Sequence, residues 1–174
     1  SIRLFPGTSS VSSSETLGYS KKSVEPPWSQ ENASVNLKGG YYMAKPRDTL
    51  DIIRKDICSD IHRYFDVKVE AHHHEVATSG QCEINIHHGE MLSMADTITT
   101  IKNLIKIKAI HVGKVATFMP KPIYGDNASA MHIHHSILSG SKNAFYDQDD
   151  KVAGLSQTGR YYIGGILSHA EALC

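Results

Sequence analysis

Apolar positions in the middle of the chain recur at the spacing of an amphipathic helix. The stripe consists of Leu50, Ile53, Ile57, Ile61 and Phe65. Intervals of three and four residues place these side chains on one face of a helix. Asp48 stands where an N-cap would lie, with Asp51 three residues on. We therefore expect this helix to begin just after Asp48.

Two further helices follow from the same reasoning. The second runs from residue 93 to about residue 111, and its apolar face consists of Met94, Ile98, Ile101 and Ile105. Gly113 provides a stop signal for it. The third covers residues 155–172, and Ser156 marks its start.

Alternating apolar and polar positions predict strands between the helices, over residues 67–76, 82–88, 115–119 and 131–138. In the second of them, Ile84 faces one side and Glu83 the other. Thr78-Ser79-Gly80 is a turn signal that would fold the second strand back beside the first. These elements predict an α+β fold. Its antiparallel sheet carries polar site residues on one face and is packed by helices on the other.

The chain divides into two parts by composition. Residues 1–38 are rich in serine, contain Pro26-Pro27 and show little periodicity, so we expect an irregular surface segment there. Residues 39–174 hold all the predicted helices and strands. A length of 174 residues suits one domain with a sizeable core.

Composition and charge narrow the class of protein. The chain is 40% hydrophobic and 21% charged, with 18 basic and 18 acidic residues. Without a basic excess we expect no nucleic-acid partner, and without a long apolar run we expect no membrane span. Three sparse cysteines favour a reducing, cytoplasmic compartment. The chain starts without Met and stops directly after a helical pattern, so we expect it to be a piece of a longer protein.

Polar residues concentrate in two blocks among the strands, residues 72–83 and residues 118–136. Together with His87 and His88, which follow the first block, they account for eight of the eleven histidines. In the first block, the predicted turn would bring Glu75 and Glu83 together. Two carboxylates in one pocket repel each other unless a cation lies between them or one is protonated. Oxygen ligands suit Mg²⁺ or Mn²⁺. The alternative is that both are exposed strand residues in solvated pairs.

In the second block, His132, His134 and Ser136 alternate and so share one face of the predicted strand. They are either ligands of a metal or phosphate, or hydrogen-bonded strand residues. The preceding segment, 120–130, is rich in proline, glycine and alanine, which is typical of an ordered loop whose backbone binds substrate.

Several long motifs in these blocks resemble glutamine synthetase of the prokaryotic type. They are Val69-Glu70-Ala71-His72-His73-His74-Glu75-Val76-Ala77, Gly80-Gln81-Cys82-Glu83, Ala116-Thr117-Phe118-Met119-Pro120-Lys121-Pro122, Gly125-Asp126-Asn127, Met131-His132 and Tyr161-Tyr162-Ile163-Gly164-Gly165-Ile166. The similarity extends from about residue 38 to residue 174, so residues 39–174 resemble the central part of the catalytic domain. The resemblance implies an ATP-dependent ligase that forms glutamine from glutamate and ammonia through γ-glutamyl phosphate.

The resemblance also implies roles for individual residues. Glu75 and Glu83 would be ligands of one metal ion, Mg²⁺ or Mn²⁺, and His132 a ligand of a second. The ATP-binding residues would be Glu70, His134 and Ser136, and the glutamate-binding residues Asn127 and Ala128. No catalytic residue beyond the metal ligands is implied within this segment. Family members form dodecamers, so the resemblance implies a homo-oligomer.

The sequence departs from the family pattern at a few positions. Ala128 and Ala130 stand where glycine is usual, so either a positive φ or a close approach to the substrate would be disturbed. His88 stands where an aromatic residue often packs against adenine. Ala128 and Ala130 keep open a non-catalytic homologue that binds nucleotide or glutamate. A ligase joining glutamate to another amine is a third alternative. The resemblance places the remaining ligands before Ser1 and after Cys174, so we expect the isolated 174-residue chain to be inactive.

Overall fold

The computed structural model describes residues 2–6, 10–13, 16–19 and 35–173, with side chains from residue 35 onward. It divides into two compact units, Ser1–Met131 and His132–Cys174, each of which has its own internal structure. Among the helices it describes, none combines the length and the apolar character needed to cross a membrane.

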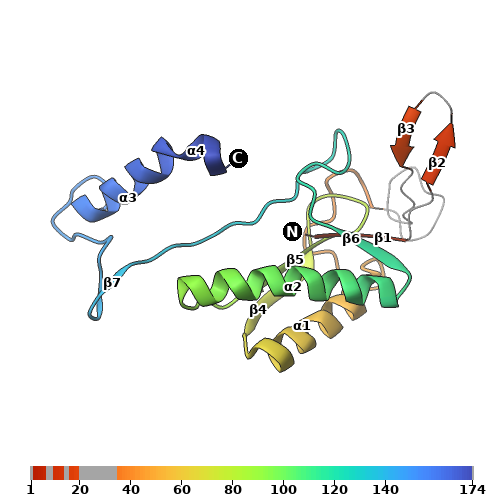
Figure 1. Ribbon diagram of the computed structural model, residues 1–174, viewed down its shortest axis with the longest axis horizontal. Helices are drawn as coiled ribbons and strands as arrows, with labels where there is room; N and C mark the ends of the chain where they lie inside the picture. The colour runs from red at the N-terminus through yellow and green to blue at the C-terminus, as the bar shows by residue number, and fades with distance from the viewer. Residues whose placement is uncertain (1, 7–9, 14–15, 20–34, 174) are drawn as a thin grey trace. The chain divides into compact units, whose positions relative to one another are not determined.

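A four-stranded antiparallel sheet is the centre of the first unit (Figure 1). Its strands lie in the order β4 (Val69–His74), β5 (Gln81–Ile86), β1 (Ile2–Pro6) and β6 (Lys114–Thr117). Three of these strands correspond to predicted ones: β4 is shorter than predicted at both ends, whereas β5 and β6 each begin one residue earlier and end two residues earlier. The turn predicted at Thr78-Ser79-Gly80 is confirmed, because Ser79 and Gly80 adopt the positive φ values of 63° and 77°.

Strand β1 was not predicted. It lies between β5 and β6, with Arg3 opposite both Gln81 and Thr117. A separate hairpin consists of β2 (Ser10–Ser13) and β3 (Thr16–Tyr19). The expectation of an irregular segment over residues 1–38 is therefore wrong where strands occur. A five-residue strand in the middle of a sheet needs little periodicity, because its neighbours supply its hydrogen bonds.

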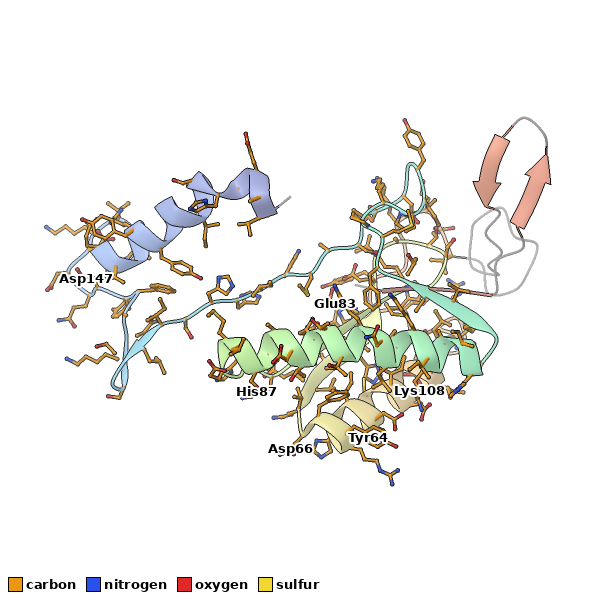
Figure 2. The ribbon with its side chains drawn as sticks, viewed as in Figure 1. Tyr64, Asp66, Glu83, His87, Lys108 and Asp147 are labelled. Atoms are coloured by element: carbon orange, nitrogen blue, oxygen red, sulfur yellow. The ribbon has the colours of Figure 1, made fainter. Side chains whose placement is uncertain are left out.

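Two helices cover one face of this sheet, α1 (Asp51–Phe65) and α2 (Met91–His111), and they lie side by side in Figure 1. The core between helices and sheet contains Leu50, Ile53, Ile57, Ile61, Cys82, Ile101, Ile105, Ala109 and Ala116. Lys108 of α2 (labelled in Figure 2) forms ion pairs with two residues of α1, since its Nζ lies 2.6 Å from Asp56 and 2.7 Å from Asp60. The predicted apolar stripes are thus the faces that the helices bury.

The start of α1 differs from the prediction. Leu50 is the N-cap and provides no side-chain capping bond. Asp48 does accept a hydrogen bond from the Leu50 backbone N–H at 3.2 Å, but its carboxylate is 5% exposed and pairs with Arg54. Asp48 is therefore a buried ion-pair partner rather than the cap, because a buried guanidinium one turn into the helix needs a counter-charge.

Asp51, the first residue of α1, is expected to make the first unit sensitive to acid. The ammonium groups of Lys45 and Lys55 lie 2.7 and 3.0 Å from Asp51 Oδ2, and these ion pairs lower the pKa of Asp51 to about 2. A carboxyl whose pKa is lowered by folding adds stability above its unfolded pKa of 3.8, and that stability is lost as the pH falls toward about 2. Asp51→Asn should flatten the loss of stability over this pH range, measured as the urea midpoint against pH. Asp96→Asn, on the exposed side of α2, is the matched control and should keep the wild-type slope.

The second unit contains the two-stranded hairpin β7 (Leu138–Ser139) and β8 (Lys142–Asn143), then α3 (Gln157–Ser168) and α4 (Ala170–Leu173). Ser156 is the N-cap of α3 as predicted, because its hydroxyl accepts a hydrogen bond from the Gly159 N–H at 3.1 Å. The helix predicted over 155–172 is correct in position but divided at His169.

The strand predicted over residues 131–138 is wrong. Residues 131–137 are extended but belong to no ladder, and their side chains are exposed within the unit. Alternation in sequence gives a strand only where another strand supplies hydrogen bonds. Among the described residues, ladder pairing in this part of the chain begins only at Leu138, which pairs with Asn143.

Candidate metal centre

Three side chains converge at one end of the β4–β5 pair. His73, Glu75 and Glu83 each offer one ligand atom, and these atoms lie within 4.8 Å of one another. His73 is 6% exposed and Glu83 is about one-third exposed. The sequence predicted the approach of Glu75 to Glu83, and the structure brings them together. Histidine 73 was not predicted as a member of the group.

Strand register explains why these residues meet. His73 lies directly opposite Glu83 in the β4–β5 ladder, so both side chains project from the same face. Glu75 is two residues beyond His73, and its backbone N–H donates to the Gln81 carbonyl at 2.8 Å. Cys82, on the other face, belongs to the core under the helices. The sheet therefore presents the metal-binding group on one face and packs against the helices with the other, as predicted.

The hydrogen bonds of His73 decide which of its ring nitrogens faces the carboxylates. Its Nδ1 lies 3.0 Å from the carbonyl oxygen of His74. A carbonyl oxygen can only accept, so Nδ1 carries the proton. In the neutral ring, Nε2 then presents a lone pair to Glu83 Oε1, 3.6 Å away. A lone pair and two carboxylates in one place form a donor set that a divalent cation satisfies.

Tyrosine rings enclose this group from the side of residues 39–42. Tyr42 stacks on the His73 ring with centroids 4.1 Å apart, and Tyr41 meets the same ring edge-on at 5.4 Å. Partial burial, together with Tyr42, Glu75 and Glu83, raises the pKa of Tyr41, so this hydroxyl stays protonated beside the carboxylates.

Gly40 permits this close approach. Its N–H donates to the Val76 carbonyl at 3.0 Å. A side-chain carbon at this position would lie 2.5 Å from the Glu75 carbonyl oxygen and 2.6 Å from the His74 ring. Glycine is therefore required for residues 39–42 to lie along the edge of β4.

A buried cation supports the strands from the helix side. Arg54 of α1 is 2% exposed and makes two hydrogen bonds to the Asp48 carboxylate, with Nη1–Oδ1 at 3.0 Å. Its Nε donates to His72 Nδ1 at 3.4 Å, and its Nη1 lies 3.5 Å from Cys82 Sγ. Burial and the positive charge of Arg54 lower the pKa of His72. Arg54 thus contacts the residue next to His73 and the residue next to Glu83.

The loop over residues 120–130 lies against the turn that joins β4 to β5. Buried Asp126 accepts hydrogen bonds from Thr78, from the backbone N–H at 3.1 Å and from Oγ1 at 2.9 Å. Gln81 donates to the Ala128 carbonyl at 2.8 Å. The two predicted glutamate-binding residues, Asn127 and Ala128, are therefore held in the same unit as the metal-binding group.

Alanine in this loop causes no backbone strain. Among described non-glycine residues, positive φ occurs at Lys38, Tyr42, Asp66 and Ser79, and so at neither Ala128 nor Ala130. Both alanines are exposed within the unit. The sequence raised two concerns about these alanines, a required positive φ and a close approach to the substrate. The first does not apply, because neither alanine adopts a positive φ.

Glu70, a predicted nucleotide-binding residue, lies at the far end of β4 from the metal-binding group. Its carboxylate is 2.7 Å from His87 Nδ1, and this hydrogen bond lowers the pKa of Glu70. The rings of His87 and His88 lie 4.2 Å apart (Figure 2 labels His87). Glu70 and His87 are each about half exposed, which is compatible with a ligand-binding surface.

The remaining predicted site residues, His132, His134 and Ser136, belong to the second unit. All three are exposed there, and the predicted strand that would align them on one face is absent. Their neighbour His135 contacts Tyr162 of α3, with Nδ1 3.1 Å from the hydroxyl. The roles of these three residues stay predictions.

Fold and site together define a class of protein: an α+β domain whose antiparallel sheet presents an imidazole and two carboxylates for a divalent cation. Comparison with known proteins makes this specific. The sequence profile of the glutamine synthetase catalytic domain matches residues 10–174. The chain belongs to this family, which uses ATP and a divalent metal.

Relatives and solved structures agree with this assignment. The chain is 47% identical over 158 residues to glutamine synthetase of Sulfolobus acidocaldarius, and 48% identical over 139 residues to that of Streptomyces coelicolor. These matches cover 90% and 80% of the chain but 33% and 29% of the relatives. The chain thus spans about a third of the length of the curated relatives it matches.

Solved structures show the same fold. A cryo-EM structure of Plasmodium falciparum glutamine synthetase aligns with 99% of this chain and 35% of its own length, at a TM-score of 0.89 and 29% identity. A structure titled "GmaS/ADP complex" aligns with 83% of this chain and 33% of its own, at a TM-score of 0.64 and 30% identity. The α+β fold predicted from the sequence is confirmed.

Proposed function

We propose that this chain is part of an ATP-dependent ligase that forms glutamine from glutamate and ammonia. The observation that carries the proposal is the convergence of His73, Glu75 and Glu83 in a member of the glutamine synthetase family. A phosphoryl transfer from ATP to a carboxylate brings several negative charges together, which requires cationic stabilisation. The group provides a place for that cation.

Glu75 and Glu83 would hold the metal, Mg²⁺ or Mn²⁺, and His132 would hold a second ion. The bound metal supplies charge neutralisation and orients substrate oxygens. The Glu75 carboxylate is oriented by a hydrogen bond from the Val76 N–H to Oε2 at 2.6 Å. Tyr42, stacked on His73, keeps the imidazole plane fixed and shields one side of it from water.

The chain also holds residues that we assign to the substrates. We assign glutamate to Asn127 and Ala128, whose backbone is held by Asp126 and Gln81. We assign ATP to Glu70, His134 and Ser136. ATP would transfer its γ-phosphoryl group to the γ-carboxylate of glutamate and leave as ADP. Ammonia would then attack the γ-carboxyl carbon, displace phosphate and lose a proton to give the amide.

The proposal is tested by incubating the full-length protein with glutamate, ATP, Mg²⁺ and ammonium, and measuring glutamine and phosphate release. Equal amounts of both products are expected. A panel of primary amines in place of ammonium tests the second activity, a glutamate–amine ligase. Binding of ATP or glutamate with no product from any amine would contradict both and favour a non-catalytic homologue.

We further infer a cytoplasmic homo-oligomer, with a dodecamer as the expected assembly. The chain has only three cysteines, a sparse set that favours a reducing compartment. Many apolar side chains of the described helices are exposed, including Ile110 at 67% and Leu167 at 68%. Light scattering of the full-length protein measures the assembly directly.

A further inference from the structure

We infer that Gln81 is a positioning residue that sets the place of the glutamate-binding backbone relative to the metal-binding carboxylates. The inference rests on the proposed function, since it takes residues 127 and 128 as the glutamate subsite. It concerns a side chain that neither binds the metal nor contacts the substrate in that proposal.

Gln81 is placed between the two parts of the site. It is the first residue of β5, two positions before Glu83, and only 1% exposed. Its backbone carbonyl accepts the Glu75 N–H at 2.8 Å, so its main chain fixes one carboxylate of the metal-binding group. Its side chain points to the 120–130 loop, where it donates to the Ala128 carbonyl at 2.8 Å.

Both the oxygen and the nitrogen of the Gln81 side-chain amide make hydrogen bonds. Its oxygen accepts the Ala77 N–H at 3.0 Å, and its nitrogen donates to the Ala128 carbonyl and to Ser129 Oγ, the latter at 3.2 Å. An amide nitrogen has two N–H donors, and both have acceptors here. Glutamine is therefore specified over glutamate, which has no donor when ionised, and over apolar residues of the same length.

The peptide unit that joins Ala128 to Ser129 is fixed at both ends. Gln81 holds its carbonyl, and its N–H donates to the Pro120 carbonyl at 2.7 Å. A planar peptide with both polar atoms bonded cannot rotate without breaking one of them. Since Gln81 belongs to the strand that carries Glu83, its buried side chain ties this peptide directly to that strand.

Asp126 is a second link between the same two segments. Its carboxylate accepts from Thr78 on the turn and from the Asn127 N–H at 2.9 Å. Lys121 donates to the Asp126 carbonyl at 2.6 Å and closes the loop on itself. With Asp126 present, loss of the Gln81 amide should loosen the loop at Ala128 rather than release it from the turn.

The test compares Gln81→Met and Gln81→Glu with Gln148→Met and Gln148→Glu, the same changes at an exposed glutamine, in the full-length protein. Both Gln81 variants should raise KM for glutamate about tenfold or more, since small misplacements of a substrate-positioning group have effects of this size. KM for ATP should change less than about twofold. Hydrogen exchange should accelerate at residues 126–130 and stay at the wild-type rate in α1.

Two outcomes would overturn the inference. The first is an unchanged KM for glutamate with unchanged exchange at residues 126–130. The second is a joint change in both KM values together with faster exchange in α1, which would make Gln81 a merely structural residue. A wild-type protein that forms no glutamine counts against the proposed function instead, and the exchange at residues 126–130 still tests the positioning role.

Discussion

Replacing Glu83 with glutamine should lower glutamine formation by the full-length protein by about 100- to 1,000-fold. The substitution keeps the shape of the side chain but removes a negative charge from the group formed with His73 and Glu75. Metal-derived stabilisation of developing charge amounts to several kcal/mol, and each 1.36 kcal/mol changes the rate tenfold. The Mg²⁺ concentration for half-maximal activity should rise in the same variant.

Two measurements make this prediction specific to the metal. Direct titration with Mn²⁺ by calorimetry should show a weakened site in the Glu83 variant. Glu171→Gln, the same chemical change on the exposed surface of α4, should leave both activity and metal binding at wild-type values. Wild-type turnover by the Glu83 variant would remove this residue from the metal centre.

Replacing Arg54 with methionine should lower the free energy of unfolding by about 3–5 kcal/mol, because it leaves the buried carboxylate of Asp48 without its counter-charge. Burial alone lowers the pKa of Arg54, but the hydrogen bonds that Arg54 donates to Asp48 outweigh it and raise the pKa above its ordinary value. Arg54 therefore stays charged beside the Asp48 carboxylate in the native state. The urea midpoint, followed by circular dichroism at one fixed protein concentration, reports the change.

A double substitution tests whether the loss of stability comes from the missing counter-charge or from the missing side-chain volume. Asp48→Leu combined with Arg54→Met removes both charges and should recover a large part of the lost stability, since an apolar pair can replace a buried ion pair. Asp48→Leu alone should be as damaging as Arg54→Met. If the double variant is as unstable as the sum of the single ones, the two side chains do not act as a pair.

Local pattern was sufficient for the parts of the fold with strong periodicity. The stripe from Leu50 to Phe65 predicted the buried face of α1, and the alternation at Glu83 and Ile84 predicted the two faces of β5. These residues face the core because a helix or strand can bury only one set of positions. The turn between β4 and β5 followed from its serine and glycine.

Pattern failed where a partner distant in sequence decides the structure. Strand β1 exists because β5 and β6 flank it, and residues 131–137 form no strand because no described strand pairs with them. Local sequence predicted Asp48 as a helix cap, whereas in the structure its carboxylate pairs with Arg54. Each case depends on a hydrogen bond or ion pair that local spacing does not encode.

The sequence by itself determined the family, the α+β class and the pairing of Glu75 with Glu83, because these follow from motifs and from the period of a strand and its turn. Only the tertiary structure decided that His73 joins the carboxylates, that Tyr42 and Gly40 enclose them, and that Gln81 links them to Ala128. His72, His73 and His74 are the same residue type, and strand alternation by itself separates His73, on the side of Glu75, from the other two without giving any of them a role. Register against Glu83 and burial against Arg54 make them different, because a side chain's chemistry depends on which groups the fold places around it.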